Sequence, residues 1–314
     1  MKRWWLTIGL VLTTPYLESC SIAETVEVTE TDQGFLFEEA GLPVVFYQRV
    51  PKSFEGAYTR NNYLHPLWTL DGEILTQDGP ADHLHQRGVY WTWHQTYVKG
   101  TRLGDAWACQ DFVWDVMEAD VEDGPDGAKE LAVTVLWKSP IWVDGEGEQK
   151  PVVEEKTRVI VHPARTDYRA IDLEIELRAM EGEVEIGGSE DEKGYGGFSA
   201  RIEMPDDLSF MSSGSQVEPQ TTQVEVGPWV DFTGTFGASH GKSGLSILVH
   251  PSNPGAVNRW ILRRSGSMQN AVYPGREPVS IAQETPTILK YRLIVHKGAA
   301  ADLDIESLYR EYSK

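Results

Sequence analysis

Alternating apolar and polar residues decide the fold in three stretches of the chain: LAVTVLW (131–137), TRVIV (157–161) and AIDLEIEL (170–177). Successive side chains of a β-strand point to opposite faces of a sheet, so this alternation predicts strands with one buried face. Turn sequences such as Asp123-Gly124 and Asp144-Gly145 lie between the apolar runs. The pattern predicts an all-β protein, folded as a large antiparallel β-sandwich.

Further strands are predicted wherever a short apolar or alternating run recurs between turn sequences. These runs are residues 26–28, 42–47, 89–93, 112–117, 183–186, 197–203, 223–226, 244–249 and 288–295. One short C-terminal helix is predicted over residues 305–312, because Ile305, Leu308 and Tyr309 share a helical face. We expect a single β-sandwich domain over residues 41–314, preceded by an N-terminal segment over residues 20–40.

The first 19 residues have the features of an export signal. Lys2 and Arg3 precede a mostly apolar run, residues 4–17, that is too short to span a membrane. The sequence LESC at 17–20 resembles a bacterial lipobox, in which the cysteine is lipidated and becomes the new N-terminus. We therefore expect a lipoprotein signal peptide over residues 1–19 and lipidation at Cys20. The exported protein would be periplasmic or anchored in the outer membrane, with ordinary signal cleavage near Ala23 as the alternative.

Charge and cysteine content limit the partners of the chain. The 48 acidic and 28 basic residues give a formal net charge of −20, which makes nucleic acid a poor partner. An anionic ligand is not excluded, because basic side chains can be concentrated in a cleft. Membrane contact is expected only through the lipid anchor. If Cys20 is lipidated, Cys109 is the other of the two cysteines, so no internal disulfide is expected.

Residues 60–88 (RNNYLHPLWTLDGEILTQDGPADHLHQRG) contain three of the eight histidines. On an extended strand, His83, His85 and Arg87 would point to the same side. Two imidazoles on one strand face are a common way to bind a metal ion or an anionic substrate. The alternative is that His65, His83 and His85 are ordinary packing or surface residues. We favour a functional pocket, because polar side chains converge at sites.

A second polar stretch is residues 190–201 (EDEKGYGGFSAR), in which glycines flank a tyrosine. Glycine allows the backbone to approach a ligand closely, and Lys193, Tyr195 and Arg201 could all reach into a pocket. The stretch lacks the sequence of a phosphate-binding loop. The alternative interpretation is a tight turn that leads into a strand.

A third polar stretch, residues 250–254 (HPSNP), holds a histidine and an asparagine between prolines at the end of an apolar strand. Loops on a β scaffold commonly carry function, and the alternative for His250 is to cap a turn. We expect side chains from all three stretches to converge on one site. The candidates are His65, His83, His85 and Tyr195 for proton transfer, Arg60, Arg87, Lys193, Arg201, His250 and Asn253 for substrate binding, and His83 with His85 for a divalent metal ion.

Tryptophan is abundant, with eleven in the chain, and several lie near the histidine-rich stretch: Trp68, Trp91, Trp93 and Trp107. For each of them, packing in the core is the first expectation, because tryptophan is highly buried on average. At least one is expected to form a platform on which a sugar ring stacks.

The polar stretches, in this order, resemble a bacterial family named methane oxygenase PmoA. Its pattern has R-N-Y-x-H-P, D-G, L-T, D-H-x-H-H-R-G, K-G-Y-G-G and H-P-x-N-P followed by tryptophan. The matching residues are 60–66, 71–72, 75–76, 82–88, 193–197 and 250–260. Gln86 stands where the family has the second of two adjacent histidines, and on a strand it would face away from His83 and His85.

The resemblance implies a large β-sandwich, similar to the galactose mutarotase-like supersandwiches of carbohydrate enzymes. It also implies a setting of polysaccharide degradation. The methane mono-oxygenase subunit itself crosses the membrane several times. No stretch of this chain after the signal reaches the roughly 18 apolar residues of a membrane helix.

Three functions are compatible with these residues. The first is an exported enzyme, such as a hydrolase, lyase or epimerase, acting on a sugar or a uronic-acid-containing saccharide. A histidine would be the base, Tyr195 the acid, and Arg87 or Arg201 the ligand of a carboxylate. The second is a sugar-binding protein without catalysis. The third, implied by the family name, is an oxidase or oxygenase with copper or iron on the histidines.

Overall fold

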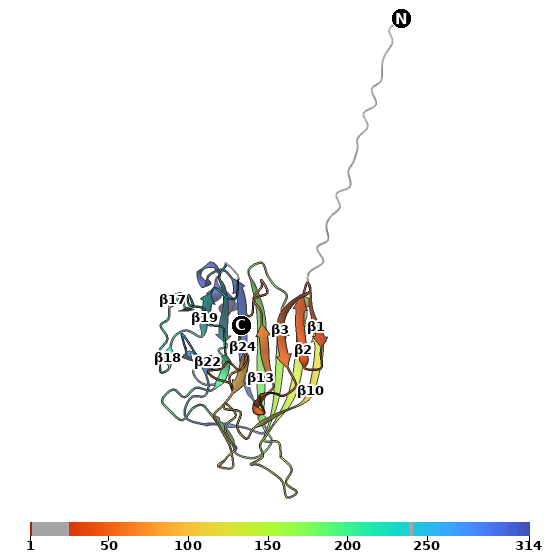
Figure 1. Ribbon diagram of the computed structural model, residues 1–314, viewed down its shortest axis with the longest axis vertical. Coiled ribbons are helices and arrows are strands. Elements are labelled where there is room, and N and C mark those ends of the chain that lie inside the picture. Colours follow the sequence, from red (N-terminus) through yellow and green to blue (C-terminus); the bar gives the residue numbers. More distant parts are fainter. Residues whose placement is uncertain (2–24, 239–240) are drawn as a thin grey trace.

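The computed structural model describes residues 1, 25–238 and 241–314, and within them the regular secondary structure is almost entirely antiparallel strands (Figure 1). The predicted lipidation site Cys20 and the predicted signal peptide beyond Met1 lie outside the described residues. Two large sheets pack face to face, which confirms the predicted antiparallel β-sandwich. The finer likeness to a mutarotase-like supersandwich stays a prediction.

One sheet, called here the rear sheet, contains the three stretches whose alternation predicted the fold. In order across the sheet its described strands are β10 (Val113–Asp123), β11 (Lys129–Lys138), β12 (Val153–Val161), β13 (Tyr168–Ala179), β24 (Thr287–Lys297), β20 (Ser243–Val249), β19 (Trp229–Gly234), β16 (Ser209–Ser212) and β17 (Ser215–Gln216). Along β13, burial alternates at every residue, with Ile171, Leu173, Ile175 and Leu177 inward. Burying each such side chain stabilises the fold by about 1.5–3 kcal/mol, so the register of the strand is firmly set.

The second large sheet, called here the front sheet, positions the candidate site. Its described strands, in order, are β1 (Val26–Glu30), β2 (Gly34–Glu39), β3 (Leu42–Gln48), β6 (Tyr63–Leu67), β7 (Val89–Thr92), β15 (Gly197–Ala200), β22 (Gln269–Val272), β21 (Arg259–Ile261) and β18 (Val224–Glu225). Strands β1 and β2 fall in the segment 20–40 that the sequence set apart, and they pair in series with β3. The sheet therefore begins within that segment.

Smaller elements complete the structure. They are a sheet of β23 (Val279–Ile281), β14 (Val184–Gly187), β8 (Gln95–Val98) and β9 (Thr101–Arg102), a hairpin of β4 (Lys52–Phe54) and β5 (Ala57–Arg60), two 3-10 turns (Pro125–Gly127 and Ala300–Asp302) and the helix α1 (Ile305–Tyr312). The bounds of α1 are those predicted. Asp304 caps the helix by accepting a hydrogen bond from the Ser307 backbone N–H. No helix in the part of the chain that the structure describes is long and apolar enough to cross a membrane.

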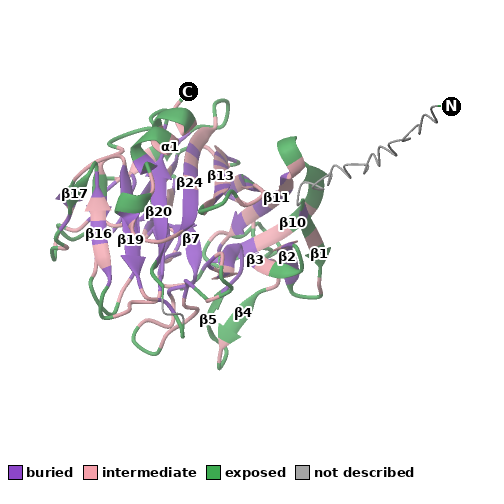
Figure 2. Cartoon of the chain, turned by 90° about the horizontal axis from the view of Figure 1, so that it is seen from above, coloured by how far each residue is buried: buried purple, intermediate pink, exposed green. Residues whose placement is uncertain are grey.

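The core lies between the two large sheets, whose central strands are buried (Figure 2). The Phe198 ring of the front sheet stacks on the Tyr291 ring of the rear sheet, with 4.1 Å between centroids. A carboxylate also lies in this core. Glu155 on β12 is fully buried and accepts hydrogen bonds from the indole N–H groups of Trp91 and Trp137, both at 2.7 Å. Charged acceptors make strong hydrogen bonds, so this carboxylate ties the two sheets together.

The apolar runs predicted as strands are all present, although their ends shift by a few residues, whereas the extended strand expected at residues 83–87 is not formed. Strand β10 continues to Asp123, and β15 ends at Ala200 rather than at residue 203. Two substantial strands, β2 and β19, were not predicted. The sequence of β2, GFLFEE, starts with glycine and ends in two acids, which weakens its strand signal.

Candidate functional site

A cleft of about 460 Å³ lies over the face of the front sheet that points away from the main core. Strand alternation creates this second face: Trp91 and Ala271 point into the core, whereas their neighbours Tyr90 and Val272 point outward. The outward side chains are nevertheless buried, because long connections fold over them. The cleft is lined by His83, His85, Gln86, His94, Trp107, Ala108, Lys193, Tyr195, Arg263, Ser265, Gly266, Ser267 and Met268.

The floor of the cleft is a small aromatic and aliphatic cluster that is separate from the main core. It contains Tyr63, Tyr90, Trp107, Ile261, Met268 and Val272, with Tyr195 packed against them. Trp107 is only 1% exposed, with rings of Tyr90, His94 and Tyr195 around it. Trp91 and Trp93 are in the main core. These three tryptophans therefore pack as core residues, and Trp107 supports the cleft without offering an open ring face to a sugar.

His94 lines the cleft and pairs with Asp105, which is not itself a lining residue. His94 follows β7 and donates from Nδ1 to Asp105 Oδ2 at 2.8 Å, while the Ala108 backbone N–H donates to Asp105 Oδ1 at 3.0 Å. Burial by itself raises the pKa of Asp105, but the hydrogen bond from His94 holds the pKa below its ordinary value. The ionised carboxylate favours the tautomer with the proton on Nδ1, and in that tautomer Nε2 is an acceptor. That Nε2 is buried and has no hydrogen-bond partner.

His83 and His85 reach the same cleft, but not from a strand. Residues 81–88, all of which the structure describes, form consecutive turns, closed by hydrogen bonds from His83 N to Pro80 O and from Gln86 N to His83 O. The predicted strand is therefore wrong here. The two imidazole rings lie edge to face, with 5.6 Å between centroids. Gln86 also lines the cleft, although strand parity would have turned it away.

The two imidazoles have different surroundings. Burial, followed by the nearby charges of His83 and Arg60, lowers the pKa of His85 to about 4, so its ring is neutral at pH 7. His83 Nδ1 lies 3.4 Å from Asp82 Oδ2 but is buried without a hydrogen bond of good geometry. Together with His94 Nε2, this gives two buried imidazole nitrogens without partners beside one cleft. Unsatisfied buried polar atoms of this kind are rare and call for an explanation.

Arg201 does not line the cleft but holds in place the loop of residues 81–88, called here the histidine loop, which carries His83 and His85. It follows β15, and its side chain is 4% exposed. Its Nη2 donates to both carboxylate oxygens of Asp82 at 2.9 Å, its Nη1 donates to Gln86 Oε1 at 3.1 Å, and its Nε donates to Gln77 Oε1 at 2.9 Å. These four bonds occupy the guanidinium. The predicted role in substrate binding is replaced by the positioning of the loop that carries His83 and His85.

Tyr195 and Lys193 enter the cleft from the connection between β14 and β15. Burial, and then the carboxylate of Asp191, raises the pKa of Tyr195, so the phenol is protonated at neutral pH. A Cβ on Gly194 would lie 2.6 Å from Arg276 N, and one on Gly196 would lie 2.9 Å from the Gly188 Cα. The glycines of this stretch therefore allow the chain to approach its own backbone, rather than a ligand as predicted.

Arg60 and Arg87 are buried outside the cleft. The Arg60 guanidinium lies over the Trp114 ring at 4.4 Å and over the Tyr90 ring at 5.0 Å, beneath the floor. Arg87 donates to Asp78 Oδ1 at 3.0 Å and to backbone carbonyls of Lys52 and Tyr58 at 3.1 and 2.6 Å. Neither guanidinium is open to a ligand, because both are at most 1% exposed. Their predicted substrate contacts are not made by this arrangement.

His65 belongs to the cluster around Asp78 and not to the cleft. Its Nδ1 is hydrogen-bonded to Thr76 Oγ1 at 2.9 Å. Burial lowers the pKa of His65 to about 4, with the Asp78 carboxylate acting in the opposite direction. The ring is therefore neutral at pH 7, and the structure gives it a place in packing beside β6.

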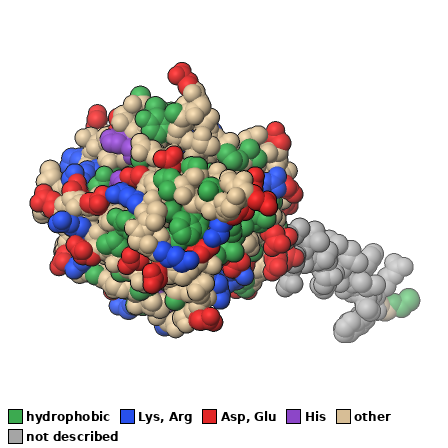
Figure 3. All heavy atoms as spheres, turned by 90° about the horizontal axis from the view of Figure 1, so that it is seen from below, with side chains coloured by type: hydrophobic (Ala, Val, Ile, Leu, Met, Phe, Trp, Pro, Cys, Tyr) green, Lys and Arg blue, Asp and Glu red, His purple; other side chains and the backbone are tan. Residues whose placement is uncertain are grey.

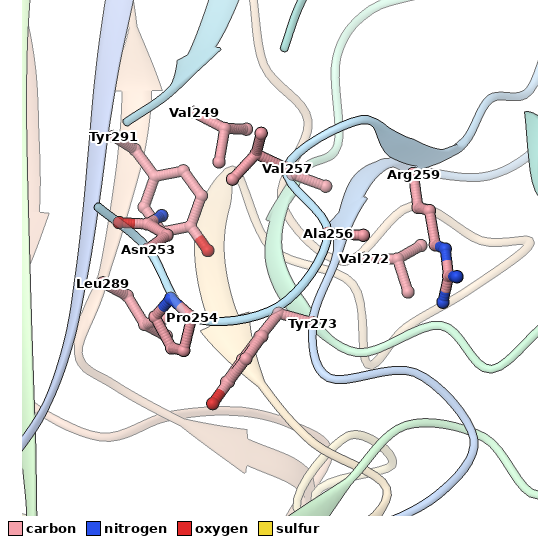
Figure 4. A pocket seen from close by; sticks show the side chains of 11 residues that line it. Val249, Asn253, Pro254, Ala256, Val257, Arg259, Val272, Tyr273, Leu289 and Tyr291 are labelled. Atoms are coloured by element: carbon pink, nitrogen blue, oxygen red, sulfur yellow. The ribbon is translucent and has the colours of Figure 1, made fainter. Parts of the chain in front are cut away.

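His250 and Asn253 also lie away from the cleft. His250 Nδ1 is bonded to Ser252 Oγ at 2.7 Å, and its ring packs edge to face on Tyr312 of α1. Asn253 donates to Lys290 O and accepts from Lys290 N, so it fastens the loop to β24. Beside Asn253 is a narrow cavity of about 10 Å³, enclosed by Val249, Pro254, Tyr273 and Tyr291 (Figure 4). This volume is no more than that of a single water, so it is too small for a substrate.

A metal ion was predicted at His83 and His85. Within residues 25–238 and 241–314, no group of three or more His, Cys, Asp or Glu side chains is placed to hold a metal ion. The two histidines thus lack the further ligands that a protein metal site of these residue types requires. The described residues therefore do not fit a bound metal ion.

The structure therefore brings together four of the predicted site residues, His83, His85, Lys193 and Tyr195, and adds His94, Asp105 and Arg263. The pairing of His94 with Asp105 could have been predicted from the hairpin that lies between them. Strands β8 and β9 form a hairpin in which Val98 pairs with Thr101, and continuing that register outward places residues 94 and 105 opposite each other. Lys99 and Gly100 both have positive φ, as a two-residue hairpin turn requires.

Comparison with known proteins gives a family and no activity. No curated protein was found to match the chain. One family profile matches residues 36–310, which is most of the chain and includes the front sheet from β2 onward and every residue that lines the cleft. The protein therefore belongs to the family of unknown function DUF6807.

Proposed function

We propose that the protein is an exported carbohydrate-active enzyme, which transfers protons to and from a saccharide bound in the cleft. One observation carries the proposal: His94 is oriented by an ionised Asp105 through Nδ1, while its Nε2 is buried at the cleft without a partner. A buried polar atom without a hydrogen bond costs about 1–3 kcal/mol. A ligand hydroxyl that donated to Nε2 would remove that cost.

Acid–base chemistry on a sugar needs a base and an acid on either side of the reacting atoms. His94 is the base in this proposal, because Asp105 fixes its tautomer and stabilises the imidazolium after proton transfer. Tyr195 is the acid, because its raised pKa keeps the phenol protonated. The two rings are edge to face with 4.9 Å between centroids, so both reach one small ligand.

The lining of the cleft is suited to a ligand rich in hydroxyl groups. Its volume of about 460 Å³ lies in the range of small-molecule sites, and most lining side chains are hydrogen-bonding groups. Two shallower hollows, of about 630 and 710 Å³, have no histidine among their described lining residues. The cleft is therefore the best-supported place for a saccharide.

Turnover on a panel of oligosaccharides, including oxidised and uronate sugars, tests the proposal. His94→Gln and Asp105→Asn should each lower kcat by about 10²–10⁴-fold, the usual contribution of a general base. Thermal unfolding should change little, because both side chains are partly exposed and both replacements keep a similar size. Substrate turnover that survives His94→Gln unchanged would contradict the role of this residue.

Non-catalytic sugar binding is the second candidate function, and the charge of the cleft favours it. No Asp or Glu is among the described residues that line the cleft, whereas glycoside hydrolysis generally uses a pair of carboxylates. Among enzymes, this absence favours a lyase or an epimerase over a hydrolase. A ligand that binds at the cleft and is recovered unchanged after long incubation would support the binding protein.

A further inference from the structure

We propose that the cleft is selective for sugars that carry a carboxylate, and that Arg263 binds this carboxylate with help from Lys193. This inference rests on the proposed carbohydrate function and names the substrate class. Arg263 follows β21 and lines the cleft beside Ser265 and Ser267. It was not among the residues predicted from the sequence, where Arg87 and Arg201 were the carboxylate ligands.

The two lining side chains with a permanent charge, Lys193 and Arg263, are both basic, although the chain as a whole is acidic. The chain has a formal net charge of −20, and acidic and basic side chains alternate over the face shown in Figure 3. The cleft, in contrast, is lined by Lys193, Arg263 and three histidines, with no acidic residue among the described residues that line it. Local cationic groups in a cleft attract an anion even when the protein is acidic.

The hydrogen bonds of Arg263 leave one edge of its guanidinium unoccupied. Its Nη1 donates to the backbone carbonyls of Gln220 at 2.6 Å and Leu262 at 3.0 Å, and its Nη2 donates to Thr221 O at 3.1 Å. A guanidinium has five N–H donors, and three are used. The Nε–H and the second Nη2 hydrogen have no partner within the described residues. These two donors lie side by side, which is the geometry that binds both oxygens of a carboxylate.

Arg263 also has no salt-bridge partner among the described residues, whereas the adjacent Arg264 pairs with Glu218 at 3.0 Å. Burial lowers the pKa of Arg263, which indicates a partly desolvated cation, although the carboxylate of Asp191 is near enough to act on this pKa in the opposite direction. The three carbonyl bonds hold the guanidinium in place before a ligand arrives, so little side-chain entropy is lost on binding.

Lys193 is a second, weaker cation in the same cleft. Its Nζ lies 3.1 Å from Asp191 Oδ2, and both side chains are about half exposed, so the pair is worth little and can open. Arg87 and Arg201 are not alternatives, since each is buried and bonded to an aspartate. The Nε and Nη2 donors of Arg263 therefore select the carboxylate, and Lys193 adds electrostatic attraction in the same cleft.

Affinity electrophoresis in native gels provides a test with matched ligands. The gels contain a polyuronate, such as polygalacturonate, alginate or glucuronoxylan, or the same polymer after chemical reduction of its carboxylates to alcohols. A polyuronate and its reduced form differ only in the carboxylate. Non-specific ionic binding is disfavoured because both the protein and the polyuronate are anionic. We expect retardation by at least one polyuronate and about tenfold weaker retardation by its reduced form, as one charged hydrogen-bonded contact predicts.

Variants test whether Arg263 causes the preference for a polyuronate over its reduced form. Arg263→Gln should remove the preference and leave binding of the reduced polymer within about twofold. Arg264→Gln is the matched control, because it removes the same charge one residue away and also releases a tether to the loop at 218–221. Arg263→Lys should restore part of the preference, since it keeps the charge without the paired donors.

The outcomes separate this inference from the proposed function. Equal retardation by both forms of every polymer, or an unchanged preference in Arg263→Gln, would overturn the carboxylate site. Tighter binding of a sulfated polysaccharide than of any uronate would overturn it too. His94→Gln should abolish turnover and keep the preference. If His94→Gln keeps turnover as well as the carboxylate preference, the proton-transfer role of His94 is wrong while the carboxylate site stands.

Discussion

Replacing Arg201 by methionine should loosen the histidine loop and destabilise the fold, because the arginine is a positioning residue. Methionine has a similar length and no donors, so the bonds to Asp82, Gln77 and Gln86 are lost together. Asp82 is 38% exposed, and water will replace most of the ion pair. The two bonds to glutamine oxygens are charge-assisted and worth about 1.5 kcal/mol each. We expect the free energy of unfolding to fall by about 3 kcal/mol, which lowers Tm by roughly 6 °C for a chain of this size.

Urea unfolding measures the free energy, and hydrogen exchange of residues 77–88 measures the order of the loop. Exchange should accelerate there and not in β13, the centre of the rear sheet. Arg165→Met is the control, because Arg165 is exposed. Ligand binding should weaken in Arg201→Met as the loop loosens. If stability and exchange stay unchanged while binding is lost, Arg201 contacts the ligand directly, and the positioning argument is wrong.

Three further predictions follow from the described residues and the N-terminal sequence. Glu155→Gln should destabilise the protein by about 3 kcal/mol in urea unfolding, because an amide NH₂ would face a donor and the charge-assisted bonds to both indoles would be lost; unchanged stability would contradict this. The pKa values of His65 and His85 are lowered from 6.5 to about 4, so the native state binds fewer protons than the unfolded state between these pH values. Stability should be full above pH 6.5 and fall by about 3 kcal/mol per histidine as the pH drops to 4, and His65→Gln should flatten the profile. Cys20→Ala should move the protein from the membrane fraction to the soluble periplasmic fraction, whereas wild-type protein that is already soluble would contradict the lipid anchor.

Strand periodicity was enough to predict the sandwich, because residues such as Ile171, Leu173 and Ile175 alternate without interruption. The same reasoning failed at His83 and His85. Gly79 and Pro80 precede them and favour turns, and proline cannot donate to a sheet ladder. The pair-wise spacing of the histidines imitated a strand where the chain makes two turns.

The site was only partly predictable because its key contacts join segments that are distant in sequence. Arg201 was expected to bind substrate since it follows a polar loop, but its partner Asp82 lies 119 residues away, and no local pattern reveals the pair. Arg263 had no neighbouring motif to mark it. Its unoccupied donors become evident only when the carbonyls of Gln220 and Thr221 are placed beside it.

The cleft takes its walls from five separate connections of the chain, and this has a practical consequence for finding its ligand. The lining residues run from His83 to Met268, so no short fragment contains the site, and occupancy and global unfolding are thermodynamically linked. A ligand at a hundred times its Kd stabilises the native state by about 2.7 kcal/mol. Melting curves recorded across a library of saccharides would therefore report binding directly, without a known reaction, a label or a competing probe.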